Sequence, residues 1–230
     1  MDCKKEQRAY FSGKNAMLFI DNRGHGKSDK PKKYDYYRLE KFVSDLDAVV
    51  SALKLSDFIL IGHSFGTMIS MKYCEEHPEK VRALVLIGGG VNIRMFHKIF
   101  YPISKLISSI SYRSSVKLVA NLSFAKNALE LKDWAFKEVI EKTPRYSAMN
   151  GYKTLTKVDL REVAKKIEKR TLIIVGEKDA LLPVKKSKEL NELIRGSRLV
   201  VIPEAGHCVQ LEKPDEVNRE IEEFCSKLKS

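Results

Sequence analysis

The sequence predicts an α/β fold in which a mostly parallel sheet is covered by helices on both faces. Two observations carry this prediction. Short apolar runs rich in β-branched residues alternate with amphipathic segments along the chain. In addition, Gly62-His63-Ser64-Phe65-Gly66 fits the pattern Gly-x-Ser-x-Gly and lies between such a run and a helical segment. This context predicts a nucleophilic serine held on a tight turn at the edge of the sheet.

The remaining elements follow from periodicity and turn residues. Apolar residues at helical spacing predict an amphipathic helix over 37–53. The helix after Ser64 should end near His77, and further helices are predicted at 160–167 and 214–228. Strands are predicted at 58–61, 81–87, 171–175 and 198–202.

The middle of the chain, residues 91–159, has no strand of comparable quality and reads as helical. A break is predicted at Pro102. One apolar stripe is predicted there, formed by Met95, Ile99, Ile103, Leu106, Ile107 and Ile110. We therefore divide the chain into a first part with strands (1–90), a helical segment (91–159) and a second part with strands (160–230).

A serine needs a base and an orienting carboxylate to act as a nucleophile. Asp179 and His207 each follow directly after a predicted strand, at the sheet edge where open parallel sheets bind ligands. His207 is predicted to take the proton from Ser64, and Asp179 to hold the imidazole. Among the alternatives, Glu177 and Glu204 are interpreted as surface charges. For Asp179 the competing interpretation is a helix N-cap.

The residues around Ser64 also have predicted roles. The positions of Gly62 and Gly66 are expected to require small residues, because the turn brings the two positions close together. The backbone N–H of Phe65 is the predicted oxyanion donor, and the N-terminus of the following helix favours developing negative charge.

With these motifs in place, the chain resembles the α/β-hydrolase fold superfamily, of the esterase, lipase and carbon–carbon hydrolase type. The loop from Asp21 to Pro31, which contains Asp-x-Arg-Gly-His-Gly, is similar to the loop after the fourth strand of that family, and His63, residues 176–183 and Gly206-His207 also match. The resemblance implies that Asp21 and Arg23 shape the structure and that His25 is a structural loop residue. It also implies that residues 91–159 form the lid and that residues 17–20 form the family's fourth strand. The opening segment, which ends near Phe11, then resembles the helix that precedes this strand.

The sequence departs from the family pattern at its beginning. The first three strands and the His-Gly loop, which supplies a second oxyanion donor in the family, are not found, so the second donor is unknown. Their absence would leave a gap beside the strand before Ser64, with unpaired backbone groups that a second chain or a rearranged sheet would have to satisfy. Losing one oxyanion donor costs about 2.7–4 kcal/mol of transition-state stabilisation.

We expect a serine hydrolase that cleaves a small carboxylic ester through an acyl-enzyme, without metal or organic cofactor. Ser64 argues against the haloalkane dehalogenases and epoxide hydrolases of the family, which use Asp in its place. A carbon–carbon hydrolase, thioesterase, lactonase or peptidase would use the same triad. The alternative from another class is a catalytically inactive remnant that serves as a binding or partner subunit.

The chain carries a formal net charge of +12. Residues 91–170 hold 17 Lys and Arg against 7 Asp and Glu, an excess of 10, so most of the positive charge lies in the lid and its exit helix. A solvated surface is favoured over an anion funnel or an acidic membrane surface, and nucleic acid is not expected because no nucleic-acid motif is present. The four cysteines have no metal or redox spacing and predict reduced thiols in a cytoplasmic protein.

Overall fold

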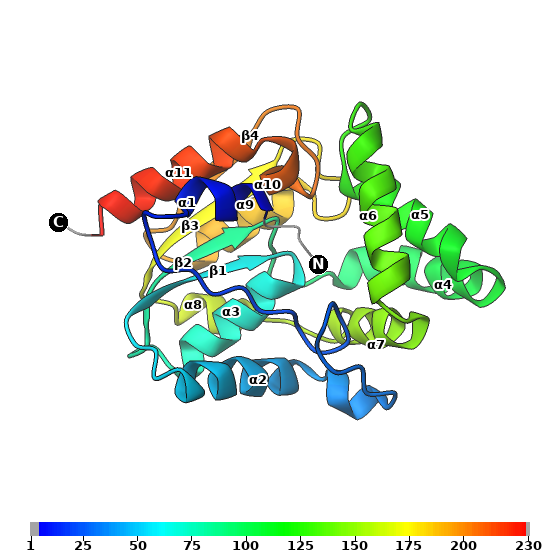
Figure 1. Cartoon of the computed structure of the whole chain (residues 1–230), viewed down its shortest axis with the longest axis horizontal. Coiled ribbons are helices and arrows are strands. Elements are labelled where there is room, and N and C mark those ends of the chain that lie inside the picture. Colours follow the sequence, from blue (N-terminus) through cyan, green and yellow to red (C-terminus); the bar gives the residue numbers. More distant parts are fainter. Residues whose placement is uncertain (1–4, 229–230) are drawn as a thin grey trace.

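The computed structural model describes residues 5–228, with the side chains of residues 94–100 outside that description. Its centre is a sheet of four parallel strands in the order β1-β2-β3-β4 (Figure 1). The strands are β1 (Phe58–His63), β2 (Val81–Ile87), β3 (Arg170–Gly176) and β4 (Arg198–Ile202). Because all four strands run the same way, their carboxyl ends share one edge of the sheet, where Ser64 also lies.

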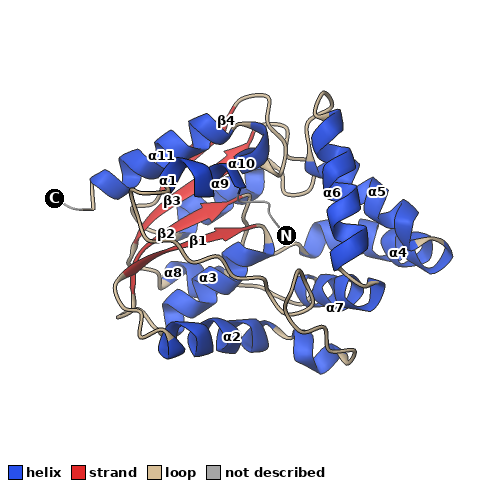
Figure 2. Ribbon diagram, in the orientation of Figure 1, coloured by secondary structure: helices blue, strands red, loops and turns tan. Residues whose placement is uncertain are grey.

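Helices cover both faces of the sheet (Figure 2). Alternate residues of β2 point to opposite faces, so Leu84 and Leu86 join one apolar cluster while Ala83, Val85 and Ile87 join the other. The first cluster includes residues of α2, α3, α8 and α9, and the second includes residues of α1 and α11. Both clusters are needed because a parallel sheet is apolar on its two faces.

The helical elements are α1 (Lys5–Phe11), the 3-10 helix η1 (Tyr34–Tyr37), α2 (Leu39–Ala52), α3 (Phe65–Glu76), α4 (Arg94–Ile110), α5 (Tyr112–Ser123), α6 (Leu129–Lys142), α7 (Arg145–Leu155), α8 (Arg161–Lys165), α9 (Val184–Leu193), α10 (Val209–Glu212) and α11 (Pro214–Ser226). The predicted α/β class and its parallel sheet are confirmed. The helices α9 and α10 were not predicted from the sequence.

The predicted break at Pro102 is wrong. Helix α4 runs from Arg94 to Ile110 with Pro102 inside it. Proline removes one backbone donor and crowds the preceding turn, but it fixes φ near the helical value. The remaining turns on each side are therefore able to continue the helix at the cost of one hydrogen bond.

The strand predicted at residues 17–20 is also wrong, because this segment has no regular secondary structure. Met17, Leu18 and Phe19 are exposed by 37%, 49% and 40%. A strand is defined by backbone pairing with a neighbour, and no described residue forms a ladder with this segment. An apolar run alone therefore did not determine its structure.

The outer edge of β1 has no ladder partner within residues 5–228, because β1 pairs only with β2. The exposed fraction of Ile61 on this strand is 43%. The sequence predicted a gap beside this strand, and within residues 5–228 no second strand forms a ladder with it.

The lid predicted from the sequence contains α4, α5, α6 and α7, which lie beyond one end of the sheet (Figure 1). Its two ends meet where Asn92 and Asp159 form an isolated antiparallel bridge. Beside this bridge, the N–H of Leu160 donates to the carbonyl of Val91 at 2.8 Å. The division of the chain into core and lid parts stays a prediction. Among the described helices, none has the length and apolar character to cross a membrane.

Candidate active site

Ser64 lies on the tight turn between β1 and α3, as the sequence predicts. It is the residue before the first turn of α3 and has φ 53° and ψ −119°. This positive φ is rare for a residue with a side chain and stores strain of about 1–3 kcal/mol. The turn is held by a bond from the Ser64 N–H to the carbonyl of Ile87 at 2.9 Å. Thr67 adds a side-chain bond to the Ser64 carbonyl at 2.7 Å.

The two glycines of the motif have different structural roles. A Cβ atom on Gly62 would lie 2.4 Å from the backbone oxygen of Gly66, so this position accepts no side chain. A Cβ atom on Gly66 would meet nothing within 4 Å. The expectation that both residues must be small is therefore correct for Gly62 and wrong for Gly66. The Gly62 Cα lies against the backbone of Gly66, whereas the space into which a side chain of Gly66 would point is open.

His207 and Asp179 form a buried pair at the same edge of the sheet. The Nδ1–H of His207 donates to Oδ2 of Asp179 at 2.8 Å, and the two side chains are exposed by 5% and 0%. The other carboxylate oxygen accepts the N–H groups of Leu181 at 2.9 Å and Leu182 at 2.8 Å. Helix α9 begins only at Val184, so Asp179 is not its N-cap.

His207 is held beside the turn by contacts with its neighbours. His63, the residue before Ser64, donates from Nε2 to the carbonyl of His207 at 3.0 Å. A Cβ atom on Gly88 would lie 3.2 Å from His207 Nδ1, so this glycine lets the ring approach the end of β2. Within the described residues, no hydrogen bond joins the Ser64 hydroxyl to His207. Such bonds are often long in unliganded enzymes and tighten when substrate binds.

The other acidic and basic residues that were considered for the site, Glu177, Glu204 and His25, lie in environments other than that of the Asp179–His207 pair. Glu177 accepts the backbone N–H of Glu204 at 3.2 Å, and Lys178 pairs with both carboxylates at the surface. Burial lowers the pKa of His25, whose Nδ1 lies 3.2 Å from the carbonyl of Arg23 in its own loop. This placement agrees with the interpretation of His25 as a loop residue.

The Asp21 loop is bound into the fold by polar contacts. Asp21 accepts the N–H of Lys27 at 2.9 Å, and its carbonyl accepts the hydroxyl of Ser28 at 2.6 Å. Arg23 forms a two-pronged ion pair with Asp45 of α2, with distances of 2.6 and 2.5 Å. These contacts are structural, as the resemblance implied.

Phe65 begins α3, so its N–H has no partner within the helix and points from the positive end of the helix dipole. Its ring packs edge-on against Phe42 of α2 with centroids 4.9 Å apart, which fixes the first turn. The geometry is suitable for the predicted oxyanion donor. We assign no second donor.

Sequence reasoning missed Glu212. Its carboxylate accepts the N–H of Gly206, next to His207, and the N–H of Ala125 in the predicted lid, both at 2.8 Å. Burial raises the pKa of Glu212, while these two bonds oppose the rise. The residue therefore connects the loop that carries His207 to the predicted lid. Only its position five residues after His207 could have drawn attention to it, because the bonds depend on tertiary approach.

We expect Glu212→Ala to lower the free energy of unfolding by about 1–3 kcal/mol, because two partly buried N–H groups lose their acceptor. Folding raises the pKa of Glu212. The stability that this carboxyl group gives the folded protein is therefore complete below the unfolded pKa of about 4.3, and it is lost as the pH rises through the folded pKa. The difference from wild type should therefore narrow with increasing pH in urea titrations. The exposed Glu192→Ala is the control, and an equal effect of both changes would contradict the assignment.

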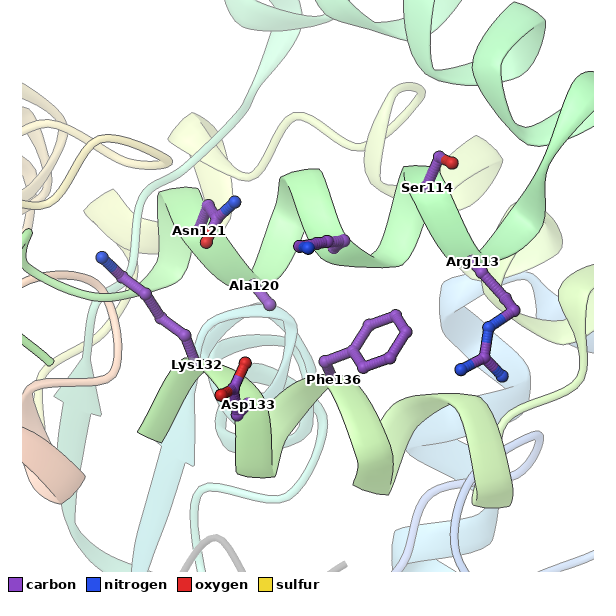
Figure 3. Close-up of a pocket in the computed structure, with 8 residues that line it drawn as sticks. Arg113, Ser114, Ala120, Asn121, Lys132, Asp133 and Phe136 are labelled. Carbon is purple, nitrogen blue, oxygen red and sulfur yellow. The ribbon is translucent and has the colours of Figure 1, made fainter. Parts of the chain in front are cut away.

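A separate pocket of about 350 Å³ lies between α5 and α6 (Figure 3). Its lining residues are Arg113, Ser114, Lys117, Ala120, Asn121, Lys132, Asp133 and Phe136. None of Ser64, Asp179 and His207 lines it. We therefore do not assign this pocket to the predicted catalytic site.

Comparisons with known proteins show which chains this one is similar to. The esterase EaEST from Exiguobacterium antarcticum superposes with a TM-score of 0.88 at 27% identity, over 100% of this chain and 87% of the esterase. The AB hydrolase superfamily protein YisY from Bacillus subtilis is 28% identical over 90% of this chain and 80% of its own. Epoxide hydrolase 1 from Caenorhabditis elegans is 23% identical, and the chain spans only 60% of its length.

The family model described as Serine aminopeptidase, S33 matches residues 12–214. This match covers the Ser64 turn, Asp179 and His207 together with the sheet that carries them. The chain therefore belongs to this family of the α/β-hydrolase fold superfamily.

Proposed function

We propose that the chain is a serine hydrolase that cleaves a carboxylic ester, with Ser64 as nucleophile, His207 as general base and acid, and Asp179 as the residue that orients His207. The observation that carries this proposal is the pairing of a strained Ser64 with a buried, hydrogen-bonded His207–Asp179 pair at one edge of the sheet. Strain of this kind clusters at functional sites.

The proposed reaction follows from these positions. Ser64 Oγ attacks the ester carbonyl while His207 Nε2 takes its proton, and the imidazolium is stabilised by Asp179. The Phe65 N–H donates to the oxyanion of the tetrahedral intermediate. His207 then returns the proton to the leaving alcohol, which gives an acyl-enzyme. A water molecule activated by His207 hydrolyses it and restores Ser64.

The named relatives favour an ester over an epoxide as the substrate. The solved structure named an esterase shares 27% identity with this chain over its whole length. A relative named an epoxide hydrolase is less similar, and the resemblance implies Asp rather than Ser at its nucleophile position. Ser64 therefore favours acyl transfer. The same triad is compatible with thioesters, lactones, peptides and carbon–carbon bonds, which a substrate panel separates.

The test is covalent labelling by a fluorophosphonate, followed by intact-mass measurement. We expect one label per chain, because an activated serine reacts with such probes through the same attack that opens an ester. Ser64→Ala should remove the label, and Ser114→Ala, which changes an exposed lid serine, should keep it. A folded wild-type protein that takes no label would overturn the proposal.

The second candidate is a non-catalytic binding subunit. Two observations favour it: within the described residues no hydrogen bond joins Ser64 to His207, and β1 forms a ladder with β2 alone. It predicts that wild type and Ser64→Ala are equally unreactive towards the probe and equally stable. The labelling experiment therefore separates the two candidates.

A further inference from the structure

Helix α4 presents an apolar face to solvent. Ile103, Leu106 and Ile110 are exposed by 47%, 62% and 81%. Their spacing of three and four residues places them on one side of the helix. Single exposed apolar residues are ordinary, whereas a continuous apolar face usually marks a binding surface.

The opposite side of the same helix is turned inward, and it carries two serines beside Tyr101, whose ring centroid lies 5.3 Å from that of Tyr152. Ser108 is only 2% exposed, and its hydroxyl bonds to the Lys105 carbonyl at 3.0 Å and lies 3.5 Å from Met149 Sδ. Ser104 is half-buried. The described part of α4 therefore turns two serines and one tyrosine inward and leaves three large aliphatic side chains outside, whereas the apolar side of a surface helix usually faces the protein. Such a reversal is expected when something other than the protein covers the outer face.

The helices α4 and α5 carry charge of a single sign. From Arg94 to Ser123 the sequence contains five Lys or Arg residues and no Asp or Glu. Lys105 in α4 and Arg113 and Lys117 in α5 are exposed. Arg113 and Lys117 also line the pocket between α5 and α6, to which α6 adds Lys132 and the acidic Asp133 (Figure 3). An apolar face bordered by cations is complementary to a surface that is apolar inside and anionic outside.

A second copy of this chain does not provide that complement. A two-fold interface brings the same patch of both copies together. Here it would set two acid-free, cationic helices against each other. An anionic bilayer supplies acyl chains for the apolar side chains and phosphate groups for the cations.

We infer that the outer face of α4, formed by Ile103, Leu106 and Ile110 and bordered by Lys105, docks this protein on the surface of an anionic lipid bilayer. The helix lies in the plane of the interface and does not cross it. In Figure 1, α4 and α5 lie at the end of the molecule away from the sheet, so the body of the protein leaves this face accessible. The inference does not depend on Ser64 or on the proposed reaction.

The test is co-flotation of the full chain with vesicles of phosphatidylcholine that contain or lack phosphatidylglycerol. We expect binding to the anionic vesicles, little binding to the neutral ones, and a strong decrease at about 1 M salt, where the Debye length falls to about 3 Å. Ser64→Ala should bind like wild type. Equal binding to both kinds of vesicle, or none to either, would overturn the proposal.

Matched variants locate the surface. Ile110→Asn should weaken binding about tenfold, because an isoleucine side chain that is 81% exposed no longer transfers into the acyl region. Leu53→Asn, at an exposed leucine after α2, should have no effect. Lys105→Gln should weaken binding about fivefold, and Lys41→Gln on α2 should not.

All four variants change exposed side chains, and circular dichroism checks their folding. If the α2 variants weaken binding as much as the α4 variants, the docking surface is wrong. If gel filtration without vesicles shows a dimer that Ile110→Asn abolishes, the face binds a second copy, and the lipid proposal is overturned.

Discussion

Replacing Asp179 with asparagine should lower kcat for ester hydrolysis by about four orders of magnitude while the protein stays folded. Oδ1 of Asp179 accepts two backbone N–H groups, from Leu181 and Leu182. An asparagine keeps these bonds only if its oxygen takes the same place. Its amide nitrogen then faces His207 Nδ1, which must become the acceptor.

This reversal moves the imidazole proton to Nε2, the atom that should receive the proton of Ser64. A nitrogen that already carries a proton cannot act as the base, so Ser64 is not activated. The measurement is the initial rate on a short-chain ester, with urea unfolding as the check on stability. Glu177→Gln, on the same loop, is the control and should retain activity. Loss of activity in Glu177→Gln with retention in Asp179→Asn would reassign the acid.

The second large effect is expected at Gly62. A methyl group there would lie 2.4 Å from the Gly66 oxygen and 2.6 Å from its carbonyl carbon, so the backbone of the turn must move. Overpacking of this kind costs about 1–3 kcal/mol and sometimes more. Because the moving atoms carry Ser64 and Phe65, we expect Gly62→Ala to lose fluorophosphonate labelling as well as stability.

Gly66→Ala provides the matched comparison within the same motif. Gly66 lies inside α3, and its added Cβ would meet no atom within 4 Å. Alanine is favoured over glycine in a helix, so the free energy of unfolding should rise by about 0.5–1 kcal/mol. Urea titration of both variants measures the contrast. Equal destabilisation by the two changes would mean that the turn differs from the one described.

The sheet was predictable because its signal is local. The strands β2 and β4 have the predicted bounds, since each is a continuous apolar run that ends at turn residues. The place of Ser64, Asp179 and His207 followed from the same logic. Each residue comes directly after a strand, and parallel strands bring their carboxyl ends to one edge. Their catalytic roles stay predictions.

The predictions that failed concern features that depend on contacts between residues far apart in the sequence. Residues 17–20 have the composition of a strand, but a strand exists only through pairing. Glu212 reads as an ordinary surface residue, although its bonds reach Ala125, 87 positions away in the sequence. Gly66 was misread because a motif does not show on which side of a turn the space is filled. The predicted apolar stripe of α4 gave no sign of whether it faces the protein or solvent; Ile103, Leu106 and Ile110 of that stripe are exposed, and Met95 and Ile99 lie outside the described side chains.

The bridge between Asn92 and Asp159 has an evolutionary consequence. The helical segment leaves the core at Val91 and returns at Leu160, and these two buried residues share a backbone hydrogen bond. The two chain crossings that join this segment to the core therefore lie side by side, and removal of the segment would leave chain ends already in register. We expect such a segment to be exchangeable as a cassette between relatives, so that substrate preference can diverge while the sheet is inherited unchanged.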